Sequence, residues 1–351
     1  MTLPKVLFIL KYRNSYDYGS YHGHLKSSGL LNSATFVSDM LKHRGFNSHL
    51  IEVVDSNNID RMVTLYKPDI VILEALWVPP DKLNQLRRIH PKIKWVVRLH
   101  SEVPFIANEG MAIEWVNKYL LIPNTYIGFN AEEALYDFKK YFRTTGKNVE
   151  TYLLNLSNYY PVSSLPIVKK STQPEFNVGC FGAIRPLKNQ LIQAFAAIEY
   201  ARKHELKLKF HINTTRRDNS SADPILKNLR NLFNHSSQYV LVEHDWLDRH
   251  KFLHLVRQMD IGLQVSMSET FNIVTADFVS EGIPVVTSNE VDWIPSRFHA
   301  ETTSVESIVK GMDRAIWHHG WFGWLDISRK ALKKRVEENV EIWVETLKAL
   351  D

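Results

Sequence analysis

The sequence predicts an α/β protein made of two Rossmann-like halves, and three observations carry that prediction. Short runs of Val, Ile, Leu and aromatic residues recur along the chain, each followed by a polar loop and then by a stretch with helical periodicity. The runs show no polar–apolar alternation, which is typical of strands buried on both faces of a parallel sheet. The same order of elements starts a second time after a break that contains three prolines.

The first half alternates strands and helices in the order that indicates a doubly wound sheet. Its predicted strands cover residues 6–10, 49–54, 70–73, 95–99 and 126–129. Its predicted helices cover residues 33–43, 59–66 and 131–141. Ligands bind such sheets outside the carboxyl ends of the strands, so we expect a binding edge there.

The second half follows residues 155–175, whose prolines and weak periodicity indicate a linker. Its predicted strands cover residues 176–181, 209–212, 239–243, 261–264 and 284–287. Its predicted helices cover residues 189–204, 222–233, 249–257 and 274–281, and an amphipathic helix over residues 330–350 ends the chain.

These elements predict three parts of the chain. We expect an N-terminal Rossmann-like domain over residues 1–160, a C-terminal one over residues 174–328, and a closing helix over residues 329–351 that packs back across the hinge. Two facing domains of this kind imply a cleft between them.

The composition is that of an ordinary folded protein, with 44% hydrophobic and 23% charged residues. A net charge of +5 permits a polyanionic partner without requiring one. The single cysteine, Cys180, excludes an intramolecular disulfide and a Cys-based zinc site, and its apolar neighbours predict that it is buried. The first apolar run is too short for a membrane span and no cleavage-site pattern follows it. We therefore expect a cytoplasmic protein without stable membrane insertion.

A strand–loop–helix corner near residue 270 is the most informative segment. The predicted strand 261–264 leads into a tight loop that carries Glu269, and the helix that follows begins around Asn272 and carries Asp277. Backbone N–H groups and the helix dipole make such a helix start a ready anion site. A carboxylate at Glu269 stands where it would accept hydrogen bonds from sugar hydroxyls. The alternative is that Glu269 only favours the helix start and that Asp277 is solvated.

A second loop, over residues 179–189, also joins a predicted strand to a helix and carries Gly182, Arg185 and Lys188. Positive charge at a helix N-terminus is unfavourable unless an anion is bound there. The two cations therefore indicate an anion site, with solvated basic residues as the alternative.

Two features of the first half complete the set. His100 follows the predicted strand 95–99, at the edge where ligands bind, although a strand-end histidine is often structural. The loop over residues 11–28 is rich in tyrosine and leads into a helix at Gly29. Its tyrosines suit stacking on a sugar or a base, or an ordered surface loop.

Together these segments resemble the GT-B glycosyltransferases, specifically glycosyltransferase family 4. That family reads Glu-Gly-Phe-Gly, then a second Glu, then Gly-x-Pro-Val-Val, and here the acids Glu269 and Asp277 are followed by Gly-Ile-Pro-Val-Val. Thr270 and Asn272 stand where the family has glycines, and Asp277 stands where it has Glu. The loop over residues 179–189 resembles the family's Gly-Arg-x-x-x-x-Lys loop. Its Lys is matched in position, whereas Ala occupies the Arg position and Arg185 lies two residues further on.

The resemblance implies a role for each of these residues. Glu269 and His100 are implied as the catalytic residues, both at the donor sugar. The implied donor-binding set comprises Gly29, Gly182, Arg185, Lys188, Thr270, Phe271, Asn272 and Asp277. In this set the two cations neutralise the diphosphate, Asp277 binds the ribose, and Gly29 lets the backbone approach the donor phosphate.

The resemblance further implies a retaining transfer from a nucleotide sugar, with UDP-sugar as the expected donor. The donor would bind mainly to the C-terminal domain and the acceptor to the N-terminal domain. No Asp-x-Asp metal signature occurs, and two fixed cations can supply a metal's charge, so we expect no metal and no other cofactor. No Gly-x-Gly-x-x-Gly occurs either, which counts against a nicotinamide dehydrogenase.

The acceptor is predicted from charge. Basic pairs at residues 87–88, 139–140 and 216–217 suit DNA phosphates, and bacteriophage enzymes that glycosylate hydroxymethylated bases share the GT-B fold. We therefore predict a hydroxymethylated pyrimidine in double-stranded DNA. The alternatives are a lipopolysaccharide or capsule glycosyltransferase, a nucleotide-sugar epimerase of the same fold, and a binding module without turnover.

Overall fold

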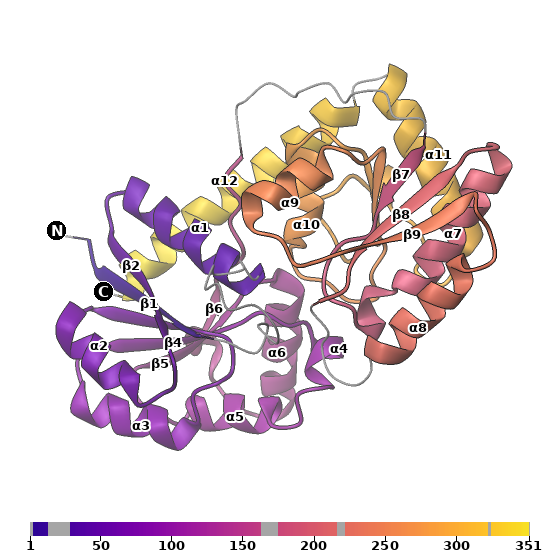
Figure 1. Cartoon of the computed structure of the whole chain (residues 1–351). Coiled ribbons are helices and arrows are strands. Elements are labelled where there is room, and N and C mark those ends of the chain that lie inside the picture. Colours follow the sequence, from indigo (N-terminus) through magenta and orange to yellow (C-terminus); the bar gives the residue numbers. More distant parts are fainter. Residues whose placement is uncertain (1–2, 13–28, 163–174, 216–221, 322–323, 351) are drawn as a thin grey trace. The chain divides into compact units, whose positions relative to one another are not determined.

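The computed structural model describes residues 3–12, 29–162, 175–215, 222–321 and 324–350 (Figure 1). The chain divides into two compact units. The first unit holds the described residues up to 161 together with residues 336–350, and the second holds those from 162 to 335. Each unit is a parallel sheet with helices packed on it, which confirms the predicted fold class.

The described part of the first unit contains a six-stranded sheet in the order β2-β1-β3-β4-β5-β6. Its strands are β1 (Lys5–Lys11), β2 (Asn47–Val53), β3 (Ile70–Glu74), β4 (Lys94–Leu99), β5 (Thr125–Phe129) and β6 (Leu153–Asn155). Its helices are α1 (Gly29–His43), α2 (Asn58–Tyr66), α3 (Pro80–Ile89), α4 (Val103–Ile106), α5 (Ala112–Tyr119) and α6 (Glu132–Thr144), and a 3-10 turn η1 (Glu150–Tyr152) precedes β6.

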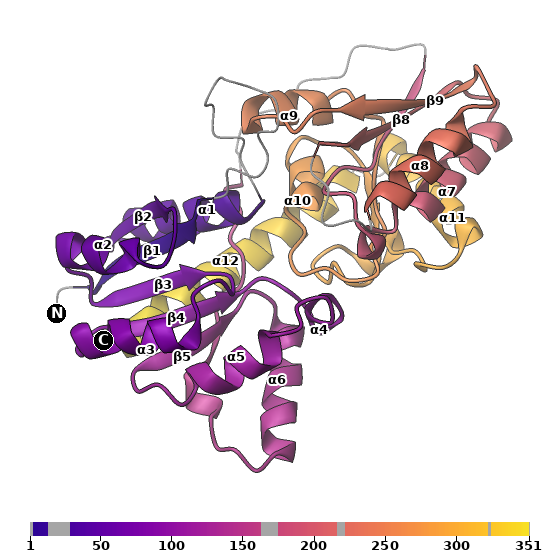
Figure 2. The same ribbon diagram turned by 60° about the horizontal axis from the view of Figure 1, so that its bottom comes forward.

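Alternate side chains of each strand in this sheet enter two separate cores. Val6 and Phe8 of β1 pack with apolar residues of α1 and of the C-terminal helix. Leu7 and Ile9 of the same strand point the other way, toward α2, α3, α5 and α6. Because both faces are covered, central strands such as β1 and β3 are almost entirely apolar, and this is why they read as unbroken hydrophobic runs. Figure 2 shows the helices on the two sides of the sheet.

The described part of the second unit contains a five-stranded sheet in the order β11-β10-β7-β8-β9. Its strands are β7 (Phe176–Gly179), β8 (Leu208–Asn213), β9 (Tyr239–His244), β10 (Ile261–Gln264) and β11 (Val285–Thr287). Its helices are η2 (Pro186–Lys188), α7 (Gln190–Lys203), α8 (Ala222–Phe233), α9 (Arg249–Val256), α10 (Ile273–Ser280), η3 (Ser296–Phe298) and α11 (Val305–Trp321).

A ring cluster fixes α9 and α10 against this sheet. Phe181, which follows β7, stacks on Phe278 of α10 with ring centroids 5.9 Å apart. It also meets Phe252 of α9 edge to face, with centroids 5.3 Å apart. Gly262 of β10 makes room for the cluster, because a Cβ there would lie 2.6 Å from the ring of Phe278.

The C-terminal helix α12 (Trp324–Leu350) is longer than predicted, since it begins six residues before residue 330. Its residues from Val336 onward belong to the first unit, where Trp343 and Leu347 are fully buried. Its earlier residues belong to the second unit, where Arg329 donates a hydrogen bond to the carbonyl of Ser280.

Several predicted elements need correction. Helices α3, α4, α5 and α11 and strand β6 lie where the sequence pattern predicts no element. The predicted linker is too long at its start, because its first residues are packed: Leu156 and Tyr160 are almost completely buried. Helix α3 begins with two prolines, and its short, mostly polar sequence gives a weak helical signal.

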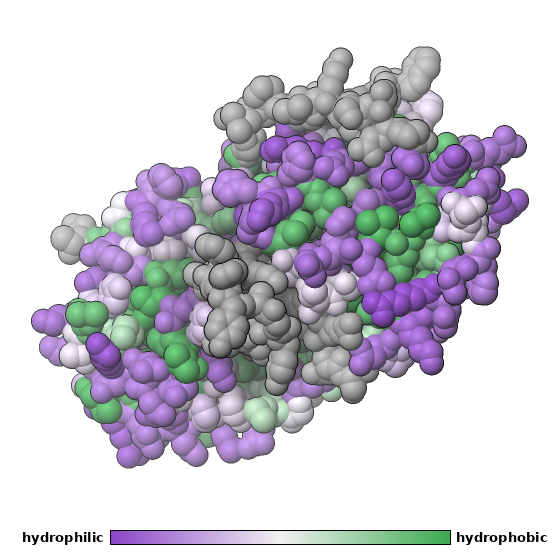
Figure 3. Space-filling view, viewed as in Figure 1, coloured by the Kyte–Doolittle hydropathy of each residue, from purple (hydrophilic) through white to green (hydrophobic). Residues whose placement is uncertain are grey.

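Polar side chains cover most of the described surface on the face drawn in Figure 3, with apolar side chains in small patches. Among the helices of the described ranges, none is both long enough and apolar enough to cross a membrane.

Candidate functional site

Each sheet has one point where the strand order reverses direction, and ligands of doubly wound sheets bind at such a point. In the second unit this point lies between β7 and β10, which are adjacent in the sheet and parallel. The loops that leave their carboxyl ends are the two segments singled out from the sequence, residues 180–189 and 265–272. The topology therefore brings the two predicted loops side by side.

Lys188 and Glu269 meet in an ion pair between these loops. The side chains are 11% and 7% exposed, so the pair is largely removed from water but open on one side. Burial lowers the pKa of Lys188, and this effect is opposed by Glu269 and increased by the nearby Arg185. The corner thus holds two cations and one carboxylate, an excess of positive charge at a loop edge.

The backbone around Lys188 is shaped by residues with special conformations. Gly182 has φ 125°, and a Cβ there would lie 3.7 Å from Cε of Lys188. Its N–H donates to Oδ1 of Asn213 at 3.2 Å. Asn189 is left-handed, with φ 59°, and its amide group donates to the carbonyls of Val265 and Thr302. Gly182 therefore allows the chain to pass close beneath Lys188, and Asn189 ties the two loops together.

The residues that follow Glu269 form the capped N-terminus of α10. Asn272 has φ 54°, a conformation that glycine adopts freely and Asn tolerates best among the other residues. Its Oδ1 caps α10 by accepting from the backbone N–H of Thr275 at 2.9 Å. Phe271 stacks on Trp293, whose indole N–H donates to the Phe271 carbonyl at 2.8 Å. An Asn can thus stand in place of the family glycine. The cap engages the N–H of Thr275, which is not one of the N–H groups of residues 270–272 that the resemblance assigns to the donor.

Asp277 lies in α10 and is almost completely buried, as its place on the inner face of that helix requires. Its Oδ1 pairs with the guanidinium of Arg249 at 2.7 Å. Arg249 is the first residue of α9 and its side chain is 21% exposed. The resemblance implies Asp277 as the ribose ligand, whereas Arg249 is a site residue that was not predicted, although a cation at the first position of a helix is the same signal that marks Lys188.

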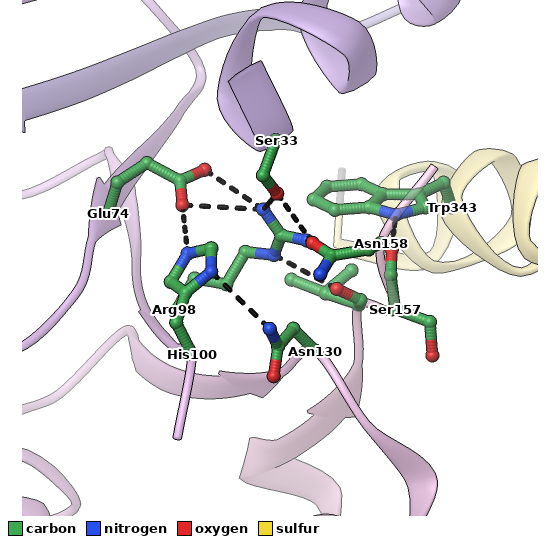
Figure 4. Close-up of polar contacts among 9 residues, drawn as sticks. Ser33, Glu74, Arg98, His100, Asn130, Ser157, Asn158 and Trp343 are labelled. Carbon is green, nitrogen blue, oxygen red and sulfur yellow. Dashed lines mark hydrogen bonds and ion pairs between the residues drawn. The ribbon is translucent and has the colours of Figure 1, made fainter. Parts of the chain in front are cut away.

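The first unit carries a second polar cluster at the carboxyl edge of its sheet, drawn in Figure 4. Glu74 ends β3, and His100 follows β4 by one residue. A ring nitrogen of His100, Nε2, pairs with Glu74, and Asn130 after β5 lies 3.4 Å from the other ring nitrogen. His100 was predicted as a site residue, whereas Glu74 was not. The signal was the same for both, a titratable residue directly after a buried apolar run.

Arg98 lies beneath this cluster and is completely buried. Its guanidinium donates to Glu74 at 3.3 Å and to Asn158 at 2.8 Å, and its Nε donates to the carbonyl of Leu156 at 2.9 Å. The ring of Trp343 covers it, with the guanidinium carbon 5.1 Å from the ring centroid. Arg98 is therefore a fixed internal cation that ties β3 and β4 to the segment after β6 and to α12.

Other predicted features are placed as follows. Gly29 is the first residue of α1, and a Cβ there would meet nothing within 4 Å. The tyrosine-rich loop before it lies outside the described residues. Cys180 is buried, as predicted, and burial raises the pKa of its thiol to about 12, so it is no nucleophile at neutral pH. Within the described ranges, no group of three or more His, Cys, Asp or Glu side chains has the geometry to hold a metal ion.

Comparisons with known proteins bear on the fold. No protein-family model matches the sequence, and no curated protein matches it. Among solved structures, a glycosyltransferase from Rickettsia africae is similar with a TM-score of 0.66 at 12% identity, over 100% of this chain and 99% of that one. A trehalose-6-phosphate structure from E. coli bound with UDP-2-fluoro glucose is similar with a TM-score of 0.66 at 10% identity, over 98% of each chain.

A UDP-forming α,α-trehalose-phosphate synthase from Burkholderia xenovorans is also similar, with a TM-score of 0.62 at 12% identity over 84% of this chain and 77% of that one. At these identities the similarity shows the fold alone, and the chemistry has to be inferred from the residues of this chain. The chain therefore has the fold of GT-B glycosyltransferases, with two Rossmann-like units that are each built on a parallel sheet.

Proposed function

We propose that the protein is a glycosyltransferase that uses a nucleotide-sugar donor. The observation that carries the proposal is the buried Lys188–Glu269 pair at the point where the second sheet reverses. A cation and a carboxylate at one loop edge match the two ends of a nucleotide sugar, a diphosphate and a polyhydroxylated ring. Solved structures of the same fold include one bound with UDP-2-fluoro glucose, which supports a UDP-sugar as the donor.

In this proposal the donor separates the Lys188–Glu269 ion pair and makes a new contact with each partner. The diphosphate takes Lys188 from Glu269, and Arg185 adds a second positive charge that already acts on Lys188. The freed carboxylate then accepts hydrogen bonds from the sugar hydroxyls. As the glycosidic bond breaks, negative charge grows on the diphosphate, and fixed cations next to a helix N-terminus stabilise it. The backbone N–H groups of residues 270–272 and the close approach allowed by Gly182 complete this half of the site.

The remaining contacts are assigned on the same basis. The Asp277–Arg249 pair would meet the ribose, with the guanidinium as the more exposed partner. His100 would contact the donor sugar near the reaction centre, and Gly29 would let the backbone of the first unit approach the phosphate. Lys188 and Arg185 supply the positive charge that a metal would bring, so the proposed transfer needs no metal. We propose retention at the anomeric carbon, as in the resembling family.

For the acceptor we propose a hydroxyl group, and a hydroxymethylated pyrimidine in double-stranded DNA is the candidate that the net charge of +5 supports. The basic pair at the end of α3 does not lie at the edge of the sheet where ligands bind. Arg87 and Arg88 lie in the last turn of that helix, which runs back from β3 to the start of β4. They therefore lie at the amino edge of the sheet, opposite His100. A surface glycan is the competing acceptor, because neutral sugars need no such charge.

The proposal is tested by donor turnover. The full chain is incubated with UDP-glucose, UDP-N-acetylglucosamine, GDP-mannose or ADP-glucose, and the released nucleoside diphosphate is measured. We expect slow release from one donor with water as acceptor, and its loss in Lys188→Met. Lys227→Met, an exposed lysine of α8 in the same unit, is the matched control. Conversion of the donor into its epimer would make the protein an epimerase, and binding of UDP without turnover would make it a binding module.

The acceptor is tested with the donor found in that experiment. Duplex DNA with hydroxymethylcytosine is compared with the same duplex containing cytosine, and the nucleosides are analysed by mass spectrometry after digestion. DNA as acceptor predicts a hexose mass on the modified nucleoside alone and binding that weakens steeply with salt. Absence of both moves the acceptor to a glycan. The anomer of any product, determined by NMR, tests retention.

A further inference from the structure

His100 does not stand alone at its strand end but belongs to a cluster in which every partner comes from a different strand end or helix. Glu74 ends β3, Arg98 lies in β4, and Asn130 follows β5. Figure 4 shows the carboxylate of Glu74 reached by both the imidazole of His100 and the guanidinium of Arg98. The cluster is therefore set by the register of the sheet, in which Glu74 and Arg98 are direct neighbours.

The charges in this cluster decide the state of the imidazole. Although burial alone would raise it, the pKa of Glu74 is held below its usual value by Arg98 and His100. Glu74 is therefore an ionised carboxylate, with one negative charge between a permanent cation and an imidazole. Burial lowers the pKa of His100, Arg98 lowers it further, and Glu74 opposes both. Because Arg98 already balances Glu74, a second positive charge on His100 would be uncompensated, and the ring is neutral at pH 7.

The position of the proton follows from the same contacts. An ionised carboxylate only accepts hydrogen bonds, so the Nε2 atom of His100 that meets Glu74 must carry the hydrogen. Nδ1 is then an acceptor, and it lies 3.4 Å from the amide nitrogen of Asn130, a long contact. The side chain of His100 is 15% exposed, whereas that of Glu74 is completely buried. The ring is thus anchored at Nε2 by Glu74, and Nδ1 lies on the side of Asn130.

The backbone shows that Glu74 is held in place. Ala75, the next residue, has φ 70°, a left-handed conformation that costs free energy for a residue with a side chain. Its N–H donates to the carbonyl of Arg98 at 2.9 Å, which locks this turn against β4. A buried ion pair is in itself a poor source of stability, because desolvation of both groups offsets their attraction. A strained backbone at Ala75 and a buried ion pair that adds little stability, both at the end of one strand, are typical of a functional position.

We propose that Glu74 is a positioning residue: it fixes His100 as the neutral Nε2–H tautomer, so that Nδ1 accepts a hydrogen bond from a hydroxyl of the donor sugar. This inference rests on the proposed function for the sugar contact, while the tautomer stands on the geometry of the first unit alone. The sugar hydroxyl would then replace the long Asn130 contact at Nδ1, and Arg98 is the charge that keeps Glu74 ionised without protonating His100.

The tautomer is tested by two-dimensional 15N–1H NMR on the full chain labelled at histidine, with the His100 signals identified by their loss in His100→Gln. At pH 7 we expect a protonated Nε2 and an unprotonated Nδ1. A ring protonated at Nδ1 alone, or at both nitrogens, overturns the inference without any need for a Glu74 variant. This measurement requires no substrate, so it is independent of the outcome of the donor assay.

The positioning role is tested with Glu74→Gln, Glu74→Asp and Ser33→Ala. Gln keeps the size of the side chain but has an amide that would turn toward His100 while its oxygen stays with Arg98, which moves the ring proton to Nδ1. We expect kcat for UDP release from UDP-glucose to fall by about 10–100-fold, the range seen for partners that orient metal-ligating histidines, with a smaller change in KM. Asp keeps the charge and should restore part of kcat.

Ser33→Ala is the matched control, because Ser33 bonds to Asn158 and to the same guanidinium nitrogen of Arg98 that meets Glu74, so its loss disturbs the support of Arg98 but leaves the Glu74–His100 contact in place. It should lower the melting temperature while kcat is retained. If Glu74→Gln lowers only the melting temperature and leaves both the tautomer and kcat unchanged, Glu74 is merely structural and the inference is wrong. A wild-type chain that shows the expected tautomer but turns over no donor would instead refute the proposed function.

Discussion

The Lys188–Glu269 pair gives the sharpest prediction, because loss of either partner should lower stability, whereas only loss of Lys188 should weaken nucleotide binding. Lys188→Met leaves Glu269 as a carboxylate that is 7% exposed and has lost its cation. Breaking a buried pair in this way costs about 3–5 kcal/mol. For a unit of this size, that corresponds to a fall in melting temperature of roughly 6–20 °C.

The double variant Lys188→Met/Glu269→Gln removes both charges. Its loss of unfolding free energy should be smaller than the summed losses of the two single variants by about 2–3 kcal/mol, the upper end of coupling between contacting residues. The measurement is a double-mutant cycle from thermal and denaturant unfolding. Lys227→Met, on the exposed side of α8, should change stability by less than about 0.5 kcal/mol.

Titration calorimetry with UDP then separates the two partners. Lys188→Met should weaken UDP binding by about 1.5–3 kcal/mol, or roughly 10–150-fold, the range for a hydrogen bond to a charged group. Glu269→Gln should bind UDP at least as tightly as the wild type, because the lysine no longer has to leave a carboxylate, while sugar turnover falls at least a hundredfold. Equal weakening of UDP binding in both variants would show that the pair only holds the loops together.

Three further predictions concern the second unit. Arg249→Leu leaves the buried Asp277 without its cation, so it should lower the melting temperature and weaken UDP binding, and an unchanged affinity would remove Arg249 from the nucleotide site. Asn272→Gly keeps the left-handed backbone and should cost only a few tenths of a kcal/mol in unfolding experiments, whereas Asn272→Ala should cost about 1–2 kcal/mol. Burial lowers the pKa of His244, against an opposing effect of Asp245. As the pH falls below 6.5, the unfolded chain therefore takes up the proton before the folded chain does, and the folded state loses stability. His244→Gln should reduce this loss, which is measured by melting curves at pH 5.5 and 7.5.

The fold was largely predictable because its signals are local. Strand β10 (Ile261–Gln264) and helix α8 (Ala222–Phe233) have the bounds that the sequence predicts. A strand buried on both faces is apolar throughout, and an amphipathic helix repeats with its own turn, so each can be recognised within a dozen residues. Helix α3 was missed because two prolines at its start and a run of basic residues at its end outweigh its three buried side chains.

The candidate site was predictable only in part, for a related reason. Loops that follow strands of one sheet must meet at its carboxyl edge, and this is enough to predict that Lys188 and Glu269 lie together. The environment of Arg98 follows from no such rule. Its partners include the carbonyl of Leu156, 58 positions away, and Trp343, which itself bonds to a carbonyl 186 positions away. Contacts of this range depend on how the last helix returns to the first unit, and no local pattern records that.

The two units each place one cation and one carboxylate at the carboxyl edge of a sheet, but the two pairs differ in what they can do. Arg98 and Glu74 are both completely buried, and the guanidinium has further partners in Ser33, Leu156 and Asn158. Exchanging such a pair for a ligand would leave several groups unsatisfied, so it can only orient its neighbours. Lys188 and Glu269 lie in loops, each partly open to solvent. A lysine is a mobile point charge that can change partner without breaking a fixed set of hydrogen bonds. The physical difference between arginine and lysine therefore assigns the Arg98–Glu74 pair to positioning and the Lys188–Glu269 pair to binding, and it predicts that Lys188→Arg will bind UDP less well than the wild type even though the charge is kept.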